Sequence, residues 1–321
     1  MNSDHKLAIL IPAFKITFFK ETIESIANQT CKDFTLYIGD DASPSNFEKI
    51  IDSYKDKINI IYRRFEENLG GKDLVAHWNR CINLIKDEQW IWLFSDDDLM
   101  ENNCVELFYK HSDKHKKDNL LHFNIEVINE KNIKIYRTKK FPLHFSTNQY
   151  FSEVIKQNVY SCVVEYIFRR DLFEKVGRFK TFDLAWSSDT ATWLKLSLYG
   201  GINTIEGAKV KWRLSNLNIS SMSNDKAIVL RKTNASIEYI KWAKLFFKKN
   251  NLKDITSDVE KVRWLLIGII YTTDLSFKEK YKIIVDALKH LSQEKNKKTI
   301  LLFWAIEELK RKFRFIRVHN A

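Results

Sequence analysis

Two apolar runs near the start of the chain have the pattern of buried strands. Lys6–Pro12 is almost entirely aliphatic and ends in Pro, and Phe34–Gly39 is a second run that ends in Asp40-Asp41. Uninterrupted apolar runs of this length are typical of strands that are buried on both faces. Between them, residues 22–27 carry apolar side chains three and four positions apart, which is helical spacing. The pattern therefore predicts a parallel unit of strand, helix and strand.

The alternation of strand and helix continues as far as residue 98. Ile58–Tyr62 predicts a third strand, Leu74–Lys86 a helix, and Trp90–Phe94 a fourth strand that leads directly into Ser95-Asp96-Asp97-Asp98. An alternating order of this kind predicts a doubly wound α/β sheet of the Rossmann type.

Acidic residues follow the predicted strands at the edge of the sheet where ligands bind. Ligands of doubly wound sheets lie beyond the carboxyl ends of the strands, so we expect Pro12, Asp40-Asp41 and Asp96-Asp97-Asp98 to line one crevice. Three consecutive carboxylates are costly to hold together, because like charges raise one another's pKa values. A hard divalent cation such as Mg²⁺ or Mn²⁺ would neutralise them. The alternative interpretation is a solvated turn or a helix N-cap.

The remainder of the chain divides into a mixed segment and a helical segment. Residues 99–225 contain apolar runs at Leu120–Ile128 and Val163–Phe168, which predict strands, and a helical pattern from about Thr190 to Tyr199. From Asp225 onward, apolar residues recur at helical spacing among lysines. We therefore predict one domain over residues 1–225, with halves at 1–98 and 99–225, and a helical extension over residues 226–321.

The net charge of +12 lies entirely in the last third of the chain. Residues 1–225 carry 31 basic and 31 acidic side chains, whereas residues 226–321 carry 22 basic and 10 acidic ones. Such a segment either is attracted to anionic lipid or nucleic acid, or is a solvated helical face. Because the first 225 residues show no basic stripe and no base-stacking motif, a nucleic-acid partner is not expected.

The cysteines and the apolar runs indicate a protein that stays in a reducing compartment. The four cysteines are far apart and form no Cys-x-x-Cys pair, which argues against a zinc site and a disulfide framework. The first apolar run is short and follows no basic segment, so it predicts a strand and not a signal peptide. No apolar run approaches the ~20 residues of a membrane-spanning helix, and we expect a cytoplasmic location.

Several motifs in the first 221 residues occur in an order that is typical of one family. The matching segments are Ala8–Phe14, Ser25–Thr30, Ile38–Ser43, Glu67–Gly70, His77–Cys81, Phe94–Leu99, Phe168–Gly177, Ser188–Leu194 and Trp212–Ser220. Together they resemble the family 2 glycosyltransferases, which have the A-type nucleotide-sugar fold (GT-A). The resemblance implies that residues 1–98 are the nucleotide-binding half of a GT-A catalytic domain and that residues 99–225 are its acceptor half.

The resemblance also implies a role for individual residues. Asp189 matches the catalytic base, although a side chain at this position could instead cap the helix predicted from Thr190. Asp98, assisted by Asp96, matches the metal site for Mn²⁺ or Mg²⁺. Ser188 and Ser215 stand where the family commonly has a Glu and a metal- or phosphate-contacting His. The residues expected to bind the nucleotide-sugar are Pro12, Ala13, Phe14, Asp40, Asp41, Asn68, Gly70, Lys72, Asn79, Asp96 and Asp97.

The function implied by the resemblance is metal-dependent sugar transfer. We expect a nucleotide-diphosphate sugar as the donor, with UDP as the nucleotide, and a hydroxyl of a glycan or lipid-linked glycan as the acceptor. Inversion at the anomeric carbon and a place in surface polysaccharide synthesis are also expected. Two other functions stay open: a non-catalytic nucleotide-sugar-binding protein, suggested by Ser215, and a nucleotidyltransferase, although Pro12–Lys20 lacks the glycines of a phosphate loop.

Residues 298–321 combine an apolar stretch with a basic cluster. Phe303 and Trp304 lie in the apolar stretch, and five basic residues follow it: Lys310, Arg311, Lys312, Arg314 and Arg317. These are the ingredients of an interfacial helix, which would attach the protein to the anionic inner face of a membrane. The alternative is a C-terminal helix that buries Trp304 against the rest of the chain.

Overall fold

A computed structural model describes residues 6–136, 138–222, 225–270, 275–291, 298, 301, 302, 304–306 and 309. Contacts divide the chain into a sheet unit and a helical unit. The sheet unit comprises residues 1–150, 159–181 and 188–215, and the helical unit comprises residues 151–158, 182–187 and 216–321. The helical unit thus begins before the boundary that we placed near 225, and it includes two short segments from the preceding part of the chain.

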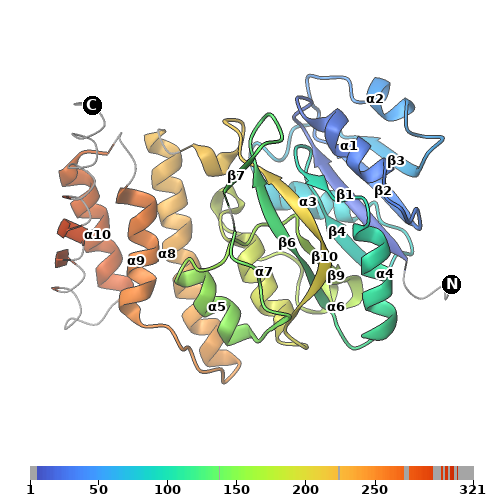
Figure 1. The fold of residues 1–321 in the computed structure, drawn as a ribbon. Coiled ribbons are helices and arrows are strands. Elements are labelled where there is room, and N and C mark those ends of the chain that lie inside the picture. Colours follow the sequence, from blue (N-terminus) through green and yellow to red (C-terminus); the bar gives the residue numbers. More distant parts are fainter. Residues whose placement is uncertain are drawn as a thin grey trace. The chain divides into compact units, whose positions relative to one another are not determined.

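Four parallel strands form one half of the sheet (Figure 1). Their order is β3 (Asn59–Arg64), β2 (Phe34–Asp40), β1 (Leu7–Ala13) and β4 (Trp90–Leu93). The register aligns Ala13 at the end of β1 with Asp40 at the end of β2. The strands expected from the four apolar runs are therefore all present, and their carboxyl ends lie at one edge.

The other half of the sheet is mixed. β9 (Tyr166–Arg169) runs antiparallel between β4 and β6 (Leu120–Ile128), and β10 (Ile202–Arg213) runs parallel to β6. Three short strands complete the sheet: β5 (Leu99–Met100) and β8 (His144–Phe145) pair with β10, and β7 (Lys134–Tyr136) pairs with β6. The sequence did not predict β10. The last residue of this strand, Arg213, donates its backbone N–H to Asp98.

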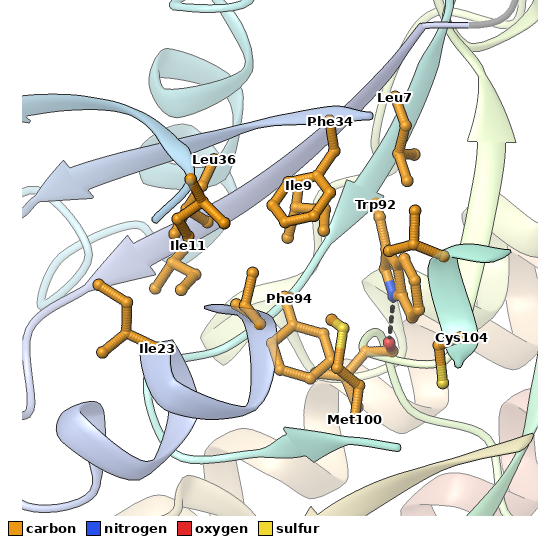
Figure 2. Close-up of a cluster of buried hydrophobic side chains, with 14 of the residues drawn as sticks. Leu7, Ile9, Ile11, Ile23, Phe34, Leu36, Trp92, Phe94, Met100 and Cys104 are labelled. Carbon is orange, nitrogen blue, oxygen red and sulfur yellow. Dashed lines mark hydrogen bonds between the residues drawn. The ribbon is translucent and has the colours of Figure 1, made fainter. Parts of the chain in front are cut away.

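Helices cover both faces of the parallel strands. α1 (Phe19–Ala27) and α4 (Cys104–Lys114) contribute to one buried cluster with alternate residues of β1 (Figure 2). α3 (Leu74–Ile82) contacts β1 and β2 and is not part of that cluster. The shorter helices of the first 200 residues are α2 (Glu48–Asp52), α5 (Thr147–Ile155), α6 (Arg170–Lys175), a 3₁₀ turn at Asp183–Ala185, and α7 (Ser188–Ser197).

Two tryptophans fix the loop that precedes β9. The Trp92 indole N–H donates to the Val164 carbonyl at 2.7 Å, as Figure 2 shows, and the Trp193 indole N–H donates to the Cys162 carbonyl at 3.2 Å. Trp92 lies on β4 and Trp193 on α7, where its ring also stacks on Tyr166 at 4.5 Å. The loop is therefore held between the two elements that carry the main predicted site residues.

In its described residues, the helical unit consists mainly of three helices that pack on one another. They are α8 (Lys226–Lys249), α9 (Asp258–Ile270) and α10 (Phe277–Leu291), and a 3₁₀ turn at Ile219–Ser221 precedes them. Asp225 caps α8 by accepting a hydrogen bond from the Ile228 N–H. This unit confirms the helical pattern expected after Asp225. Among the residues described, no helix is both long enough and apolar enough to cross a membrane.

Candidate active site

The carboxylate loop after β4 is anchored to the end of β1. Both the Phe14 and Lys15 backbone N–H groups donate to Asp96 Oδ2, at 2.8 and 2.7 Å. The Lys15 ammonium lies 2.5 Å from Asp97 Oδ2 and 3.5 Å from Asp96 Oδ1. Burial disfavours the charged ammonium, but the carboxylates outweigh it, so the pKa of Lys15 lies above its ordinary value. The structure thus brings the segments after β1 and β4 together.

Asp98 points into the protein and is almost fully buried. Its Oδ2 accepts a hydrogen bond from Ser95 Oγ at 2.5 Å, and its Oδ1 accepts one from the Arg213 backbone N–H at 2.6 Å. Burial, and then the neighbouring Asp97, raise the pKa of Asp98 to about 8. Burial is also the main cause that raises the pKa of Asp96 to about 6. Additional positive charge in this loop would therefore stabilise the ionised carboxylates.

These carboxylates fit a divalent cation that takes few protein ligands. Within the described part of the chain, no three His, Cys, Asp or Glu side chains are placed to hold a metal ion together. Mg²⁺, however, is commonly held by one or two carboxylates, with phosphate oxygens and water completing its shell. Asp96 and Asp98 would supply such a partial set through Asp96 Oδ1 and the two Asp98 oxygens, since an oxygen that accepts a single hydrogen bond keeps a second lone pair.

Arg213 holds the carboxylate loop in place from the end of β10. Its guanidinium donates to the Asp97 carbonyl at 2.7 Å and to Glu21 Oε2 at 2.9 Å, and it lies 4.2 Å from the centre of the Phe18 ring. The side chain is fully buried. The motif Trp212–Ser220 contains Arg213 but does not reveal these contacts, because the partners of Arg213 are far away in the chain. Ser215, two residues later, is buried as well.

The Asp40 carboxylate is hydrogen-bonded by residues of the neighbouring strand β3 and of the turn after β2. Its carboxylate accepts hydrogen bonds from the Ser43 N–H at 2.8 Å, the Tyr62 hydroxyl at 2.7 Å and the Arg64 guanidinium at 2.7 Å. These contacts tie the ends of β2 and β3 together. The structure therefore places Asp40 at the predicted edge, where it shapes the turn after β2.

Asp41 fastens the loop that precedes α3. Its carboxylate accepts hydrogen bonds from the Leu69 and Gly70 N–H groups, at 2.9 and 2.8 Å, and from the Arg80 guanidinium. A Cβ atom on Gly70 would lie 2.6 Å from Asp41 Oδ2, so this approach requires glycine. Asn68 closes the same loop by accepting from the Gly71 N–H at 2.7 Å.

The other predicted nucleotide-sugar residues differ in exposure. Ala13 is buried at the end of β1, Pro12 is half-buried, and Phe14 is 42% exposed. Lys72 is exposed. Asn79 lies on α3 with its Oδ1 atom buried and without a hydrogen-bond partner.

Asp189 uses one carboxylate oxygen, Oδ1, in its hydrogen bonds to Thr190. It is the second residue of α7 and half-buried, and its Oδ1 accepts from the Thr190 N–H at 2.7 Å and, at 3.4 Å, from the Thr190 hydroxyl. An N-cap carboxylate would bond the N–H two or three positions later, so the capping alternative does not match this geometry. Burial raises the pKa of Asp189 to about 6.

A buried acid, Glu165, lies within electrostatic range of both Asp98 and Asp189. The charges of both aspartates contribute to the raised pKa of Glu165, after burial as the main cause. The Glu165 side chain is fully buried, and its Oε1 accepts from the Cys162 N–H at 2.7 Å, whereas Oε2 has no hydrogen-bond partner. The loop before β9 therefore lies near both the carboxylate loop and Asp189. No sequence signal singled out this residue.

Comparison with known proteins identifies one family. The family model described as glycosyl transferase family 2 matches residues 8–177, which is more than half of the chain. An uncharacterized glycosyltransferase of Methanocaldococcus jannaschii is 27% identical over 204 residues, covering 62% of this chain and 67% of the relative. One of Mycoplasma genitalium is 28% identical over 120 residues, covering 36% and 40%. One of Rickettsia typhi is 28% identical over 193 residues, covering 59% and 58%. The chain thus matches less than two thirds of the length of the last two relatives.

Solved structures confirm the fold. S. aureus TarS residues 1–349 in complex with UDP-GlcNAc align with a TM-score of 0.65 at 13% identity, covering 95% of this chain and 88% of that chain. The same protein in complex with UDP aligns with a TM-score of 0.59 at 14% identity and the same coverage. The GT-A-type fold expected from the sequence is therefore confirmed.

Proposed function

Because this chain belongs to glycosyl transferase family 2, we propose that it transfers a sugar from a UDP-sugar to a hydroxyl of a glycan or lipid-linked glycan. The observation that carries the proposal is that an anchored carboxylate loop, Asp96–Asp98, and an acid with a raised pKa, Asp189, both lie within electrostatic range of Glu165. The UDP and UDP-GlcNAc complexes of the similar TarS structure support a uridine diphosphate donor. The site lies at the carboxyl ends of the strands, as expected for a nucleotide site.

The proposed reaction is a single displacement that inverts the anomeric carbon. Asp189 accepts the proton of the acceptor hydroxyl at Oδ2 while the hydroxyl attacks, and a pKa of about 6 makes it a stronger base than an ordinary aspartate. Asp98 and Asp96 would hold Mn²⁺ or Mg²⁺, and the bound ion would supply positive charge next to the leaving diphosphate. Arg213 keeps the loop in place during the reaction through its bond to the Asp97 carbonyl.

A donor screen tests the proposed function. We expect one or more UDP-sugars, incubated with the protein and Mn²⁺ or Mg²⁺, to release UDP, and the release to rise when the correct acceptor is added. Tight binding of UDP-sugar with no turnover in the presence of any acceptor would instead indicate a non-catalytic binder. Release of pyrophosphate from a nucleoside triphosphate and a sugar phosphate would indicate a nucleotidyltransferase.

We further propose that the product belongs to a surface polysaccharide and that the basic C-terminal residues hold the enzyme on the inner face of a membrane. Support comes from the exposed apolar side chains Leu302, Ile306 and Leu309, which are 63%, 42% and 55% exposed. Trp304 does not belong to this surface, because it is buried against Phe277 and Tyr281, with ring centroids 4.6 and 5.9 Å apart. Phe303 and the five basic residues of the predicted cluster lie outside the described residues.

Neutralising part of the basic cluster tests this attachment. Changing Lys310, Arg311 and Lys312 to Gln should weaken sedimentation with vesicles of phosphatidylglycerol by about 100-fold, since each basic residue near an anionic surface contributes about 1 kcal/mol. The matched control changes Lys114, Lys116 and Lys117, which are exposed on the sheet unit, to Gln. Equal loss in both variants would mean that only net charge matters, and no loss in either would refute the membrane proposal.

A further inference from the structure

Lys15 supplies positive charge to the site where the carboxylates converge. Its ammonium lies 2.5 Å from Asp97 Oδ2 and 3.5 Å from Asp96 Oδ1, and these carboxylates are almost fully buried. Asp98 contributes further to the field that the ammonium feels. The sequence suggested that three adjacent carboxylates require a cation, and in the structure a side chain of the same chain provides one.

The side chain and the backbone of Lys15 perform separable tasks. The Phe14 and Lys15 N–H groups donate to Asp96 Oδ2, so the backbone anchors the loop whatever side chain stands at position 15. The ammonium faces the other Asp96 oxygen and Asp97. Removing the charge should therefore leave the position of the loop unchanged while it removes the local counter-ion.

We propose that Lys15 is an intrinsic counter-cation that competes with the divalent metal ion for the carboxylate of Asp96, which both would contact. This inference rests on the metal site in the proposed function. Two cations cannot share the same carboxylate oxygens without repelling each other, so a divalent ion can bind fully only when the ammonium moves away. A diphosphate offers the displaced ammonium another anionic partner, which lowers the free-energy cost of its release.

Competition of this kind makes the metal and the nucleotide bind cooperatively. Without UDP, Lys15 opposes the metal ion, and with UDP, the ammonium pairs with the diphosphate. By linkage, UDP then raises the metal affinity by the same factor by which the metal raises the UDP affinity. Lys15 is a positioning residue in this scheme, because its effect is on the occupancy of the carboxylates and not on the transferred sugar.

Calorimetric titration of Mn²⁺ into the nucleotide-free protein tests the inference. Replacing Lys15 with Met keeps the length of the side chain and removes its charge, and we expect this K15M variant to bind Mn²⁺ about tenfold more tightly than wild type. The enhancement of Mn²⁺ affinity by UDP should be smaller in K15M. Lys15→Arg, which retains the charge, should behave like wild type, as should Lys20→Met, which removes an exposed charge on α1.

Thermal unfolding gives an independent readout. With chelator present, K15M should unfold at a lower temperature than wild type, because the carboxylates lose their counter-ion, and added Mn²⁺ should close that gap. Unchanged Mn²⁺ affinity in K15M would overturn the inference whatever UDP does. If K15M binds Mn²⁺ while wild type binds none even with UDP, the inference stands and the proposed metal dependence of native transfer is wrong.

Discussion

Replacing Asp189 with Asn should lower turnover about 10²–10⁴-fold, which is the usual contribution of a general base. The substitution preserves the size of the side chain, and the amide oxygen can still accept the Thr190 N–H at the start of α7. The substitution replaces the other carboxylate oxygen, Oδ2, with an amide nitrogen that cannot accept a proton from the acceptor hydroxyl. Because the role that we propose for Asp189 is to accept the proton of the acceptor hydroxyl, UDP affinity should change by less than about twofold. Steady-state kinetics and calorimetry of UDP binding measure the two quantities.

The pH dependence of kcat/KM separates a base from a structural carboxylate. Since the pKa of Asp189 is raised to about 6, the acid is protonated below that pH and ionised above it, so the activity of the wild type should rise as pH increases through 6. The residual activity of the Asn variant should lack this rise. Asp113→Asn, on the exposed side of α4, is the matched control and should leave rate and profile unchanged. More than half of the wild-type turnover in Asp189→Asn would exclude a catalytic base at this position.

Replacing Asp98 with Asn should reduce metal-dependent UDP affinity on the order of 10–100-fold, because the proposed metal loses a charged ligand. The amide can still accept the Arg213 N–H and contact Ser95, so the geometry of the loop should survive. Calorimetry with UDP, in the presence of Mn²⁺ and of chelator, measures the effect. In chelator, the two proteins should bind UDP equally.

Protein stability provides the control for Asp98→Asn. Burial raises the pKa of Asp98 to about 8, so the folded protein keeps a proton that the unfolded chain releases near the ordinary aspartate pKa. The free energy of unfolding therefore falls as the pH rises from the ordinary aspartate pKa to about 8. Removing the ionisable group removes that loss of stability. The metal-free variant should therefore unfold at a higher temperature than wild type at neutral pH. Lower stability together with lower affinity would indicate a distorted loop, and unchanged affinity in Mn²⁺ would refute the assignment of Asp98 to the metal.

The parallel half of the sheet could be predicted because its strands are buried on both faces. β1 and β2 are continuous apolar runs, and such a run can be predicted to be a buried strand from its own residues alone. β10 was missed because Ile202–Arg213 has no continuous apolar run and contains Gly207, where the pairing with β6 is irregular. Its identity as a strand depends on β6 and β5 as neighbours.

The candidate site was predictable where its chemistry is contiguous in sequence. Asp96–Asp98 form one cluster, and Asp189 lies in a motif that follows in the expected order. Lys15, Glu165 and Arg213 were not assigned roles, since their significance comes from contacts or charges far away in the chain. The sequence also cannot show whether a residue expected to bind the nucleotide-sugar points toward a ligand or toward the protein. Asp40 and Asp41 are examples, because their carboxylates accept hydrogen bonds from other residues of the chain.

The hydrogen bonds that the Leu69 and Gly70 N–H groups donate to Asp41 fix the backbone of the loop before α3. Fixing the backbone of a flexible residue costs about 1–2 kcal/mol of conformational entropy. In this protein the loop before α3 has already lost that freedom on folding, through Asp41 and the turn closed by Asn68. A nucleotide that reaches this loop therefore meets a surface in its final shape, and its contacts there appear as affinity without a further entropic cost of ordering the chain.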